Sequence, residues 1–391
     1  MDLRYSAAER AFRDELRSWF AHHLPRPWSA ELRDPANDAD RLVEIRRCFQ
    51  RQLCEAGYLG LDWPKKFGGK GRSVIDRVIF QEELARAAAP PLPNFVGIQI
   101  FGPALIHHGN DAQRERFILP MLRAEEIWCQ GFSEPGAGSD LAALRCSAEP
   151  DGDDFRITGQ KVWTTMGPWA DWTFLLARTD PDDRYGGITF FLLPLDQPGI
   201  EMRPLRQLTG DAEFGEVFFD GALALREHVV GRIGEGWKIA NTVLSYERGV
   251  YEIEGPARND RFLADLAEGL RESGDLARDD VRQRLARLFV ENETIQAAGL
   301  RILAALANGE TPGEEASIQK LNWSEYARRQ GEAAFDLLGP QAQLATRAPG
   351  ARAAVDWGYE HLFSLSGPIA GGSSEIQRNI IAKRALRLPT R

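Results

Sequence analysis

The chain is poor in cysteine and histidine, with four cysteines and six histidines among 391 residues. No Cys-x-x-Cys pair and no ladder of zinc ligands links the cysteines, which are Cys48, Cys54, Cys129 and Cys146. We therefore expect reduced and mostly buried thiols. The histidines at 22–23 and at 107–108 are adjacent pairs, and adjacent residues point to different sides of a helix. The sequence thus implies no metal site.

Net positive charge and long apolar runs are also missing. The formal net charge is −9, so neither nucleic acid nor an anionic membrane is an expected partner, although a local basic pocket for an anionic ligand stays open. No run approaches the ~18 apolar residues of a membrane-spanning helix. Residues 1–5 open with charges and lack the apolar segment of a secretory leader. We expect a cytoplasmic protein.

The length allows two or three domains, and 43% hydrophobic with 27% charged residues is the balance of a globular protein. Residues 1–127 are expected to form a helical domain. Ser6 and Glu9 have the spacing of a capping box before an apolar helical face. Ser73 is the expected N-cap of a segment that runs to the proline-rich break at 90–93.

Residues 128–234 are expected to form a β domain. Short aromatic and β-branched runs at 174–176, 188–193 and 217–219 are bounded by turn formers, which favours a small antiparallel barrel or sandwich. The lack of intervening helices argues against a parallel nucleotide-binding sheet.

Residues 235–391 return to a helical period. Apolar positions recur along 285–303 with mixed charges on the other face, which is typical of a helix in a bundle. The predicted fold class is mostly α with a central β domain, divided at 1–127, 128–234 and 235–391.

The first of four segments with chemical potential is residues 131–140, Gly-Phe-Ser-Glu-Pro-Gly-Ala-Gly-Ser-Asp. Its glycines let a flat or anionic ligand approach the backbone closely, and Ser133 and Ser139 add hydroxyl donors. A tight turn that enters the β domain would explain the glycines equally well.

The second segment is residues 159–165, in which Trp163 is followed by Thr164 and Thr165. An indole can stack on an aromatic cofactor while hydroxyl groups bind its polar edge. The alternative is a half-buried strand aromatic with threonines that face solvent.

The third and fourth segments lie in the C-terminal part. Glu247, among apolar neighbours in residues 243–250, could serve as a general base if it is partly desolvated, or it could be an exposed helical glutamate beside Arg248.

In residues 369–378, two glycines precede Ser373 and Ser374, either of which could be an N-cap. Such a helix start is a donor site for an oxyanion or phosphate, although capping alone needs no ligand.

These four segments, in this order and over this outline, resemble the acyl-CoA dehydrogenase family. The resemblance spans essentially the whole chain and implies an N-terminal helical domain, a middle β-barrel and a C-terminal four-helix bundle, with FAD between the barrel and the bundle. It implies an acyl-CoA substrate and an electron-transfer flavoprotein as acceptor. The residues that match the family's FAD contacts are Phe132, Ser133, Gly138, Ser139, Trp163, Thr164, Thr165, Ser373 and Glu375. Ser139 and Arg248 match its substrate contacts.

The resemblance also assigns the catalytic base. Much of the family has its glutamate where this chain has Gly371, whose side chain cannot act as a base. The branch with isovaleryl-CoA and long-chain enzymes has it in a Leu-x-x-Glu-Arg setting on the first bundle helix, which residues 244–248 match. Glu247 is therefore expected to remove the α-proton while the β-hydride passes to flavin N5, leaving a trans-2-enoyl-CoA. The Gly371 N–H and the flavin ribityl hydroxyl are the implied donors to the thioester oxygen. Glu252 and Glu254 are competing bases, and Glu254, which shares the helical face of Glu247, lies about 10 Å further along the helix.

Two family elements have no clean counterpart. The Arg-x-x-Phe-Gly element is missing around Arg261 and Phe262, and the glutamine and paired glycines of an FAD-contacting turn are replaced by Asp-Leu-Leu-Gly-Pro at 336–340. Relatives with such gaps include subunits of α2β2 enzymes that act on steroid side-chain or dicarboxylic acyl-CoAs. We therefore expect either a homo-oligomer or an α2β2 assembly with a sister subunit that completes the FAD site.

Two rival functions are also compatible with the sequence. One is a different flavin reaction on the same fold, such as nitroalkane oxidation or hydroxylation, and the other is a non-catalytic subunit that stabilises a partner.

Overall fold

The computed structural model describes residues 5–24, 28–34, 36–307, 313–344 and 355–389, with the backbone alone at 29, 30, 33, 248–254, 306 and 307. The chain divides into two compact units. One, here the helical unit, consists of Met1–Leu42, Arg72–Pro90 and Arg248–Arg391, and the other, here the sheet unit, of Val43–Gly71 and Pro91–Glu247. The division into domains at 1–127, 128–234 and 235–391 stays a prediction.

The N-terminal part of the helical unit contains α1 (Ala7–His23), α2 (Trp28–Arg33), α4 (Val74–Arg86) and the first residues of α3 (Ala39–Glu55). The predicted caps are confirmed, because Ser6 and Ser73 each form a complete capping box. Glu83 on α4 is buried and binds Arg13 and Arg17 of α1, which satisfies its charge and fastens the two helices together.

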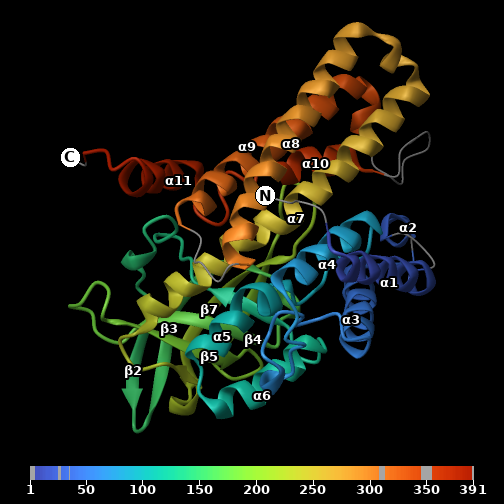
Figure 1. Cartoon of the computed structure of the whole chain (residues 1–391). Helices are drawn as coiled ribbons and strands as arrows, with labels where there is room; N and C mark the ends of the chain where they lie inside the picture. Colours follow the sequence, from blue (N-terminus) through green and yellow to red (C-terminus); the bar gives the residue numbers. More distant parts are fainter. Residues whose placement is uncertain (1–4, 25–27, 35, 308–312, 345–354, 390–391) are drawn as a thin grey trace. The chain divides into compact units, whose positions relative to one another are not determined.

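The C-terminal helices form the larger part of this unit (Figure 1). They are α7 (Gly236–Ser273), α8 (Asp279–Ala307), α9 (Glu315–Leu338), α10 (Trp357–Ser364) and α11 (Ser374–Ile380), with the short helical turns η6 (Asp275–Ala277), η7 (Gly339–Gln343) and η8 (Ile381–Ala385). Leu263, Leu285, Tyr326 and Trp357 share one apolar core, and the Tyr326 hydroxyl donates to the Leu288 carbonyl at 3.0 Å. The predicted bundle helix at 285–303 lies within α8 and is confirmed.

The sheet unit contains most of α3 (Ala39–Glu55), together with α5 (Gly102–His108), α6 (Asp111–Leu122) and the beginning of α7. Its short helical turns are η1 (Lys65–Phe67), η2 (Val96–Phe101), η3 (Leu141–Ala143), η4 (Gly167–Trp169) and η5 (Arg226–His228). No helix in the part of the chain that the structure describes is both long and apolar enough to cross a bilayer.

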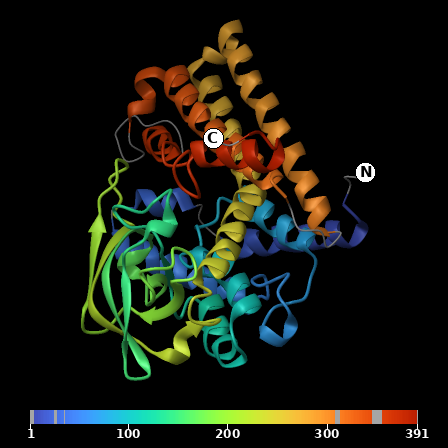
Figure 2. The same cartoon turned by 90° about the vertical axis from the view of Figure 1, so that its left-hand side faces the viewer.

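In the part of the chain that the structure describes, one sheet has eight strands. Several of them are visible as green and yellow-green ribbons in Figure 2. The eight strands are β1 (Trp128–Gly131), β2 (Ser147–Asp151), β3 (Asp154–Thr165), β4 (Trp172–Arg178), β5 (Ile188–Pro194), β6 (Ile200–Leu205), β7 (Phe214–Ala224) and β8 (Val229–Val230). The order is β6-β7-β3-β2-β4-β5-β8, with β1 paired to β4. The expected antiparallel pairing holds except for β1–β4 and β2–β4, which are parallel because long connections return the chain in the same direction.

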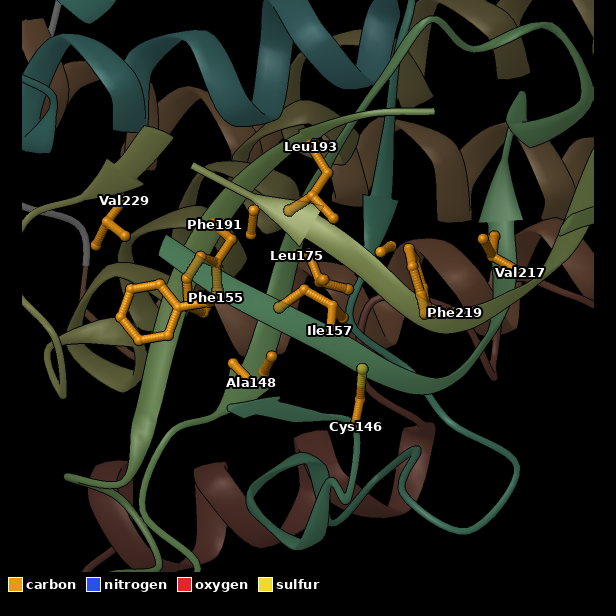
Figure 3. Packing of buried hydrophobic residues seen from close by; sticks show 13 residues of the cluster. Cys146, Ala148, Phe155, Ile157, Leu175, Phe191, Leu193, Val217, Phe219 and Val229 are labelled. Carbon is orange, nitrogen blue, oxygen red and sulfur yellow. The ribbon is translucent and has the colours of Figure 1, made fainter. Parts of the chain in front are cut away.

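Alternate residues of these strands face a common apolar core (Figure 3). Phe155 and Ile157 of β3 pack there with Leu175 of β4, Phe191 of β5 and Phe219 of β7. The observed succession of helices, sheet and helices confirms the predicted fold class.

Candidate active site

Trp163 occupies an irregular point of the sheet. The pairing of β3 with β7 changes register between Lys161 and Thr164, and Trp163 lies inside this bulge. Its φ is 62°, a left-handed conformation that costs a non-glycine residue about 1–3 kcal/mol. The side chain is 61% exposed and its ring meets Phe214 edge to face at 6.1 Å. A strained backbone that leaves a large indole exposed to solvent is typical of a ligand-binding residue.

The two threonines after Trp163 are placed differently. Thr164 is fully buried, and its hydroxyl donates to the Gly215 carbonyl at 2.6 Å. Its side chain is thereby occupied within the sheet, so only its backbone is left for a cofactor. Thr165 is half-buried and pairs with Phe214 at the end of β3. Of the two predicted hydroxyl contacts, Thr165 is the one with an accessible side chain.

The glycine-rich segment follows β1 as a loop. The Phe132 ring is buried and meets Phe174 and Phe190 edge to face, so its predicted flavin contact is left to its backbone. Ser133 is half-buried, and its carbonyl accepts from the Val162 N–H at 2.9 Å. This bond joins the loop to the strand that holds Trp163.

The second half of the loop is open. Gly138 and Ser139 are exposed, and a Cβ added at Gly136 or Gly138 would meet no atom within 4 Å. The glycines therefore leave room above the backbone, as close ligand approach requires. Asp140, at the end of the loop, forms an ion pair with Arg184 at 2.5 Å.

A buried ion pair that sequence reasoning missed lies beneath this loop. Lys161 is fully buried, and its ammonium contacts the Glu134 carboxylate at 2.8 Å. The sequence contained a signal for this pair. Alternate residues of a strand face the same side, so Lys161 points to the same buried side of β3 as Phe155 and Ile157. A charged residue at a core-facing position of a strand needs a partner.

Glu247, the predicted base, lies on α7 as the last residue of the sheet unit. Ile239, Ala240 and Val243 are buried on this helix, and Glu247 follows Val243 by one turn and is half-buried. Glu247 therefore continues the inward face of α7. The side chains of Arg248 and of the competing Glu252 and Glu254 lie outside the described residues.

The beginning of α7 is fastened to α5. His108 Nε2 and the Thr242 hydroxyl lie 2.9 Å apart. Burial lowers the pKa of His108, and the neighbouring His107 and Lys238 lower it further. The neutral imidazole thus holds the turn of α7 that precedes Glu247.

The fourth predicted segment forms the loop before α11 and the first turn of that helix, in the helical unit. Gly371 and Gly372 have φ values of 63° and 91°, which favour glycine at both positions. Ser373 is the N-cap, as one of the two sequence alternatives predicted, and its hydroxyl accepts from the Ile376 N–H at 3.3 Å. Glu375 is exposed and lies 3.4 Å from Arg378.

Two buried side chains that sequence reasoning missed support this loop. Lys320 donates to the carbonyls of Gly367 and Gly372 at 3.0 and 2.7 Å. Gln377 donates to Gly371 and Gly372 at 3.0 and 3.2 Å. Because the carbonyls of Gly367, Gly371 and Gly372 accept these hydrogen bonds from buried side chains, polar interactions fix the conformation of the loop.

The predicted contacts therefore fall into two sets. The sheet unit brings Phe132 and Ser133 together with 161–165, and the helical unit holds Gly371, Ser373 and Glu375 around the start of α11. Among the residues described, no group of three or more histidine, cysteine or acidic side chains is arranged to hold a metal ion.

Comparison with known proteins identifies the family. Residues 6–125, 129–222 and 234–386 match the models of the acyl-CoA dehydrogenase N-terminal, middle and C-terminal domains. The chain belongs to the acyl-CoA dehydrogenase family of FAD-dependent oxidoreductases.

Individual relatives are similar over nearly their full length. Acyl-CoA dehydrogenase IpdE1 of Mycobacterium tuberculosis is 41% identical over 383 residues, which are 97% of each chain. Among solved structures, the Tcur3481-Tcur3483 steroid ACAD has a TM-score of 0.90 at 30% identity, with all of both chains covered. The ChsE4-ChsE5 complex from Mycobacterium tuberculosis has a TM-score of 0.87 at 30% identity and the same coverage.

The sheet unit's residues suit FAD, the cofactor of this family. A flat ring system needs an open aromatic face, polar groups along its edge and a path of approach. Trp163 has such an exposed ring, Ser133 and Thr165 have hydroxyl groups that are not fully buried, and the space beside Gly136 and Gly138 is open.

Proposed function

We propose that the chain catalyses the α,β-dehydrogenation of an acyl-CoA thioester, with Glu247 as the base that removes the α-proton. The observation that supports this assignment is the half-buried carboxylate on the inward face of α7, in a chain that has glycine at 371. A carboxylate in such a position is shielded from bulk water, which favours proton transfer to it over solvation of its charge.

The other residues of the chain are proposed to bind and orient. The Gly371 N–H donates to the thioester oxygen as negative charge develops there, which makes the α-proton removable at neutral pH. Ser139 and Arg248 guide the CoA arm, and Gly138 and Ser139 also line the flavin. Trp163, Thr165 and Ser133 hold the flavin, together with the backbones of Phe132 and Thr164 and with Ser373 and Glu375 on its pyrophosphate side. Bound FAD supplies the acceptor for the β-hydride.

We propose further that the acyl group is bulky and derived from a steroid, and that a sister chain completes the FAD site. One structure of 30% identity is named a steroid ACAD, and two such structures carry paired chain names. The missing Arg-x-x-Phe-Gly element and the altered turn at 336–340 agree with an FAD site that this chain does not complete alone. An electron-transfer flavoprotein is the proposed acceptor.

The test is co-expression with acyl-CoA dehydrogenase-like chains encoded nearby, followed by flavin quantitation and anaerobic titration with a panel of acyl-CoAs. We expect bound FAD in the co-purified complex and bleaching of the flavin by thioesters with steroid side chains. Bleaching by straight-chain thioesters alone would contradict the substrate class. Full FAD in the chain purified alone would contradict the need for a sister chain.

The same preparation tests the rival functions. Rapid oxygen consumption by the substrate-reduced protein would favour an oxidase or hydroxylase. A complex whose flavin is reduced normally when Glu247→Gln is present would assign the chemistry to the sister chain.

A further inference from the structure

We propose that Lys161 and Glu134 are a positioning pair, which sets the distance between Ser133 and Trp163 and so shapes the flavin pocket. The inference rests on the proposed function, because it takes Ser133 and Trp163 as flavin contacts. In this role neither Lys161 nor Glu134 touches the flavin or the substrate.

Lys161 is bonded to the loop on both sides of Ser133. Its ammonium donates to the Phe132 carbonyl at 3.0 Å and to Glu134 Oε1 at 2.8 Å. The next residue of the strand, Val162, donates its N–H to the Ser133 carbonyl at 2.9 Å. Three consecutive loop residues are thereby tied to two consecutive strand residues. Any displacement of Lys161 is transmitted to Ser133.

Glu134 extends these ties to the rest of the loop. Its Oε1 also accepts from the Cys146 N–H at 2.9 Å, and its Oε2 accepts from the Arg145 N–H at 2.7 Å. Its backbone exchanges two hydrogen bonds with Ala137, closing the turn that precedes Gly138. Both carboxylate oxygens are engaged, so the charge is well satisfied in its buried position.

On the strand side, Lys161 stands at the register change. The bulge begins directly after it, and Trp163 is two residues further along. The strained φ of Trp163 needs surroundings that hold it in place, and the anchored residue before the bulge supplies such a constraint. Lys161 therefore fixes both walls of the proposed pocket, the loop and the bulge.

A pair that served stability alone would behave differently from a positioning pair. A buried ion pair adds little net stability over apolar residues of the same size, whereas loss of one partner leaves an uncompensated charge. Such a charge near the flavin changes the energy of its reduced, negatively charged form. Removal of the ammonium should lower the flavin reduction potential, and removal of the carboxylate should raise it.

The experiment compares Lys161→Met, Glu134→Gln and the double variant in the FAD-containing assembly. We expect each single variant to weaken flavin binding at least about 10-fold, measured by flavin fluorescence. The flavin reduction potential should fall in Lys161→Met and rise in Glu134→Gln, and the potential of the double variant should lie between these two values. Unchanged affinity and potential in the single variants, or shifts of both in one direction, would overturn the proposal.

Glu83→Gln is the matched control. Glu83 is also a buried carboxylate, it is paired with Arg13, Arg17 and Arg86, and it lies in the other unit. This variant should lower the melting temperature yet leave flavin affinity and potential unchanged. If Lys161→Met does not fold, Glu134→Gln against Glu83→Gln decides the question, because glutamine keeps the shape of the carboxylate.

The wild-type assembly separates this inference from the proposed function. If acyl-CoA thioesters do not reduce its flavin, the proposed function fails whatever the variants do. If they reduce it and the variants leave the flavin unaffected, only the positioning role fails.

Discussion

The hydroxyl of Thr164 donates to the carbonyl of Gly215 at 2.6 Å, at the point where β3 and β7 change register. The adjacent Trp163 is 61% exposed, with a φ of 62°. The bond anchors the residue after the indole inside the sheet, and the bulge turns the indole outward. Space at Gly215 is required for this arrangement, because a Cβ there would lie 2.8 Å from the Thr164 hydroxyl oxygen.

The first prediction concerns Trp163→Leu. Because the side chain is largely exposed, its loss should change the free energy of unfolding of the flavin-free protein by less than about 0.5 kcal/mol. Flavin affinity should fall about 10-fold, since one aromatic stacking contact is lost. Chemical denaturation and flavin titration measure the two quantities.

Trp128→Leu is the control for this prediction. Trp128 is fully buried against Phe101, Phe117 and Trp172. Its truncation should cost about 2–4 kcal/mol of stability through the cavity it leaves. If Trp163→Leu proves as destabilising as Trp128→Leu, the indole belongs to the core and not to a ligand site.

Much of the fold was predictable from local sequence signals. Ser6 and Ser73 cap helices because each has a partner at the third helical position, a pattern that is complete within four residues. The apolar stripe at 285–303 predicts its helix in the same way. The parallel pairing of β1 and β2 with β4 depends on long connections, and no local signal encodes it.

The candidate site was predictable in part, for a related reason. The glycines, Trp163 and Ser373 stand in recognisable segments, but Lys320 reaches the Gly372 carbonyl from 52 residues away. The inward direction of Thr164 depends on a bulge, which shifts the period-2 pattern of β3. Such contacts are tertiary, so a reading of neighbouring residues does not find them.

The second prediction concerns Gln377→Leu. The side chain donates to the Gly371 and Gly372 carbonyls, and leucine leaves the Gly371 carbonyl without this donor. Stability should fall by about 1–3 kcal/mol. Flavin reduction should slow about 10-fold or more, because the Gly371 N–H, the proposed donor to the thioester oxygen, loses the bond that fixes its peptide.

Gln319→Leu is the control for the loop. Gln319 is equally buried in the same unit, and its amide donates to the Ile295 carbonyl at 2.9 Å within the bundle. It should lower stability by a similar amount while the folded enzyme turns over normally. Equal loss of turnover in both variants would show that Gln377 acts through general stability alone.

The third prediction concerns the pH dependence of stability at Glu325. The Ser374 hydroxyl donates to this carboxylate at 2.7 Å, and this bond lowers the pKa of Glu325, with Arg328 and Arg378 lowering it further. A lowered folded-state pKa means that the stabilisation is complete above the ordinary value of 4.5 and is lost as the pH falls below it. At pH 7 the free energy of unfolding of the wild-type protein should exceed that of Glu325→Gln by about 1 kcal/mol. The difference should shrink toward pH 4, as measured by urea denaturation, and a constant difference would contradict the assignment.

The fourth prediction tests the base. Glu247→Gln keeps the size and hydrogen-bonding reach of the side chain on α7 but cannot accept a proton at neutral pH. Flavin and acyl-CoA binding should stay within about 3-fold of wild type, whereas anaerobic flavin reduction should slow by ~10²–10⁴-fold, the usual contribution of a general base. Glu272→Gln, at an exposed position of the same helix, should reduce its flavin at the wild-type rate. Loss of acyl-CoA binding together with the rate would instead make Glu247 a binding residue, since a base acts on the transition state and leaves the ground-state affinity intact.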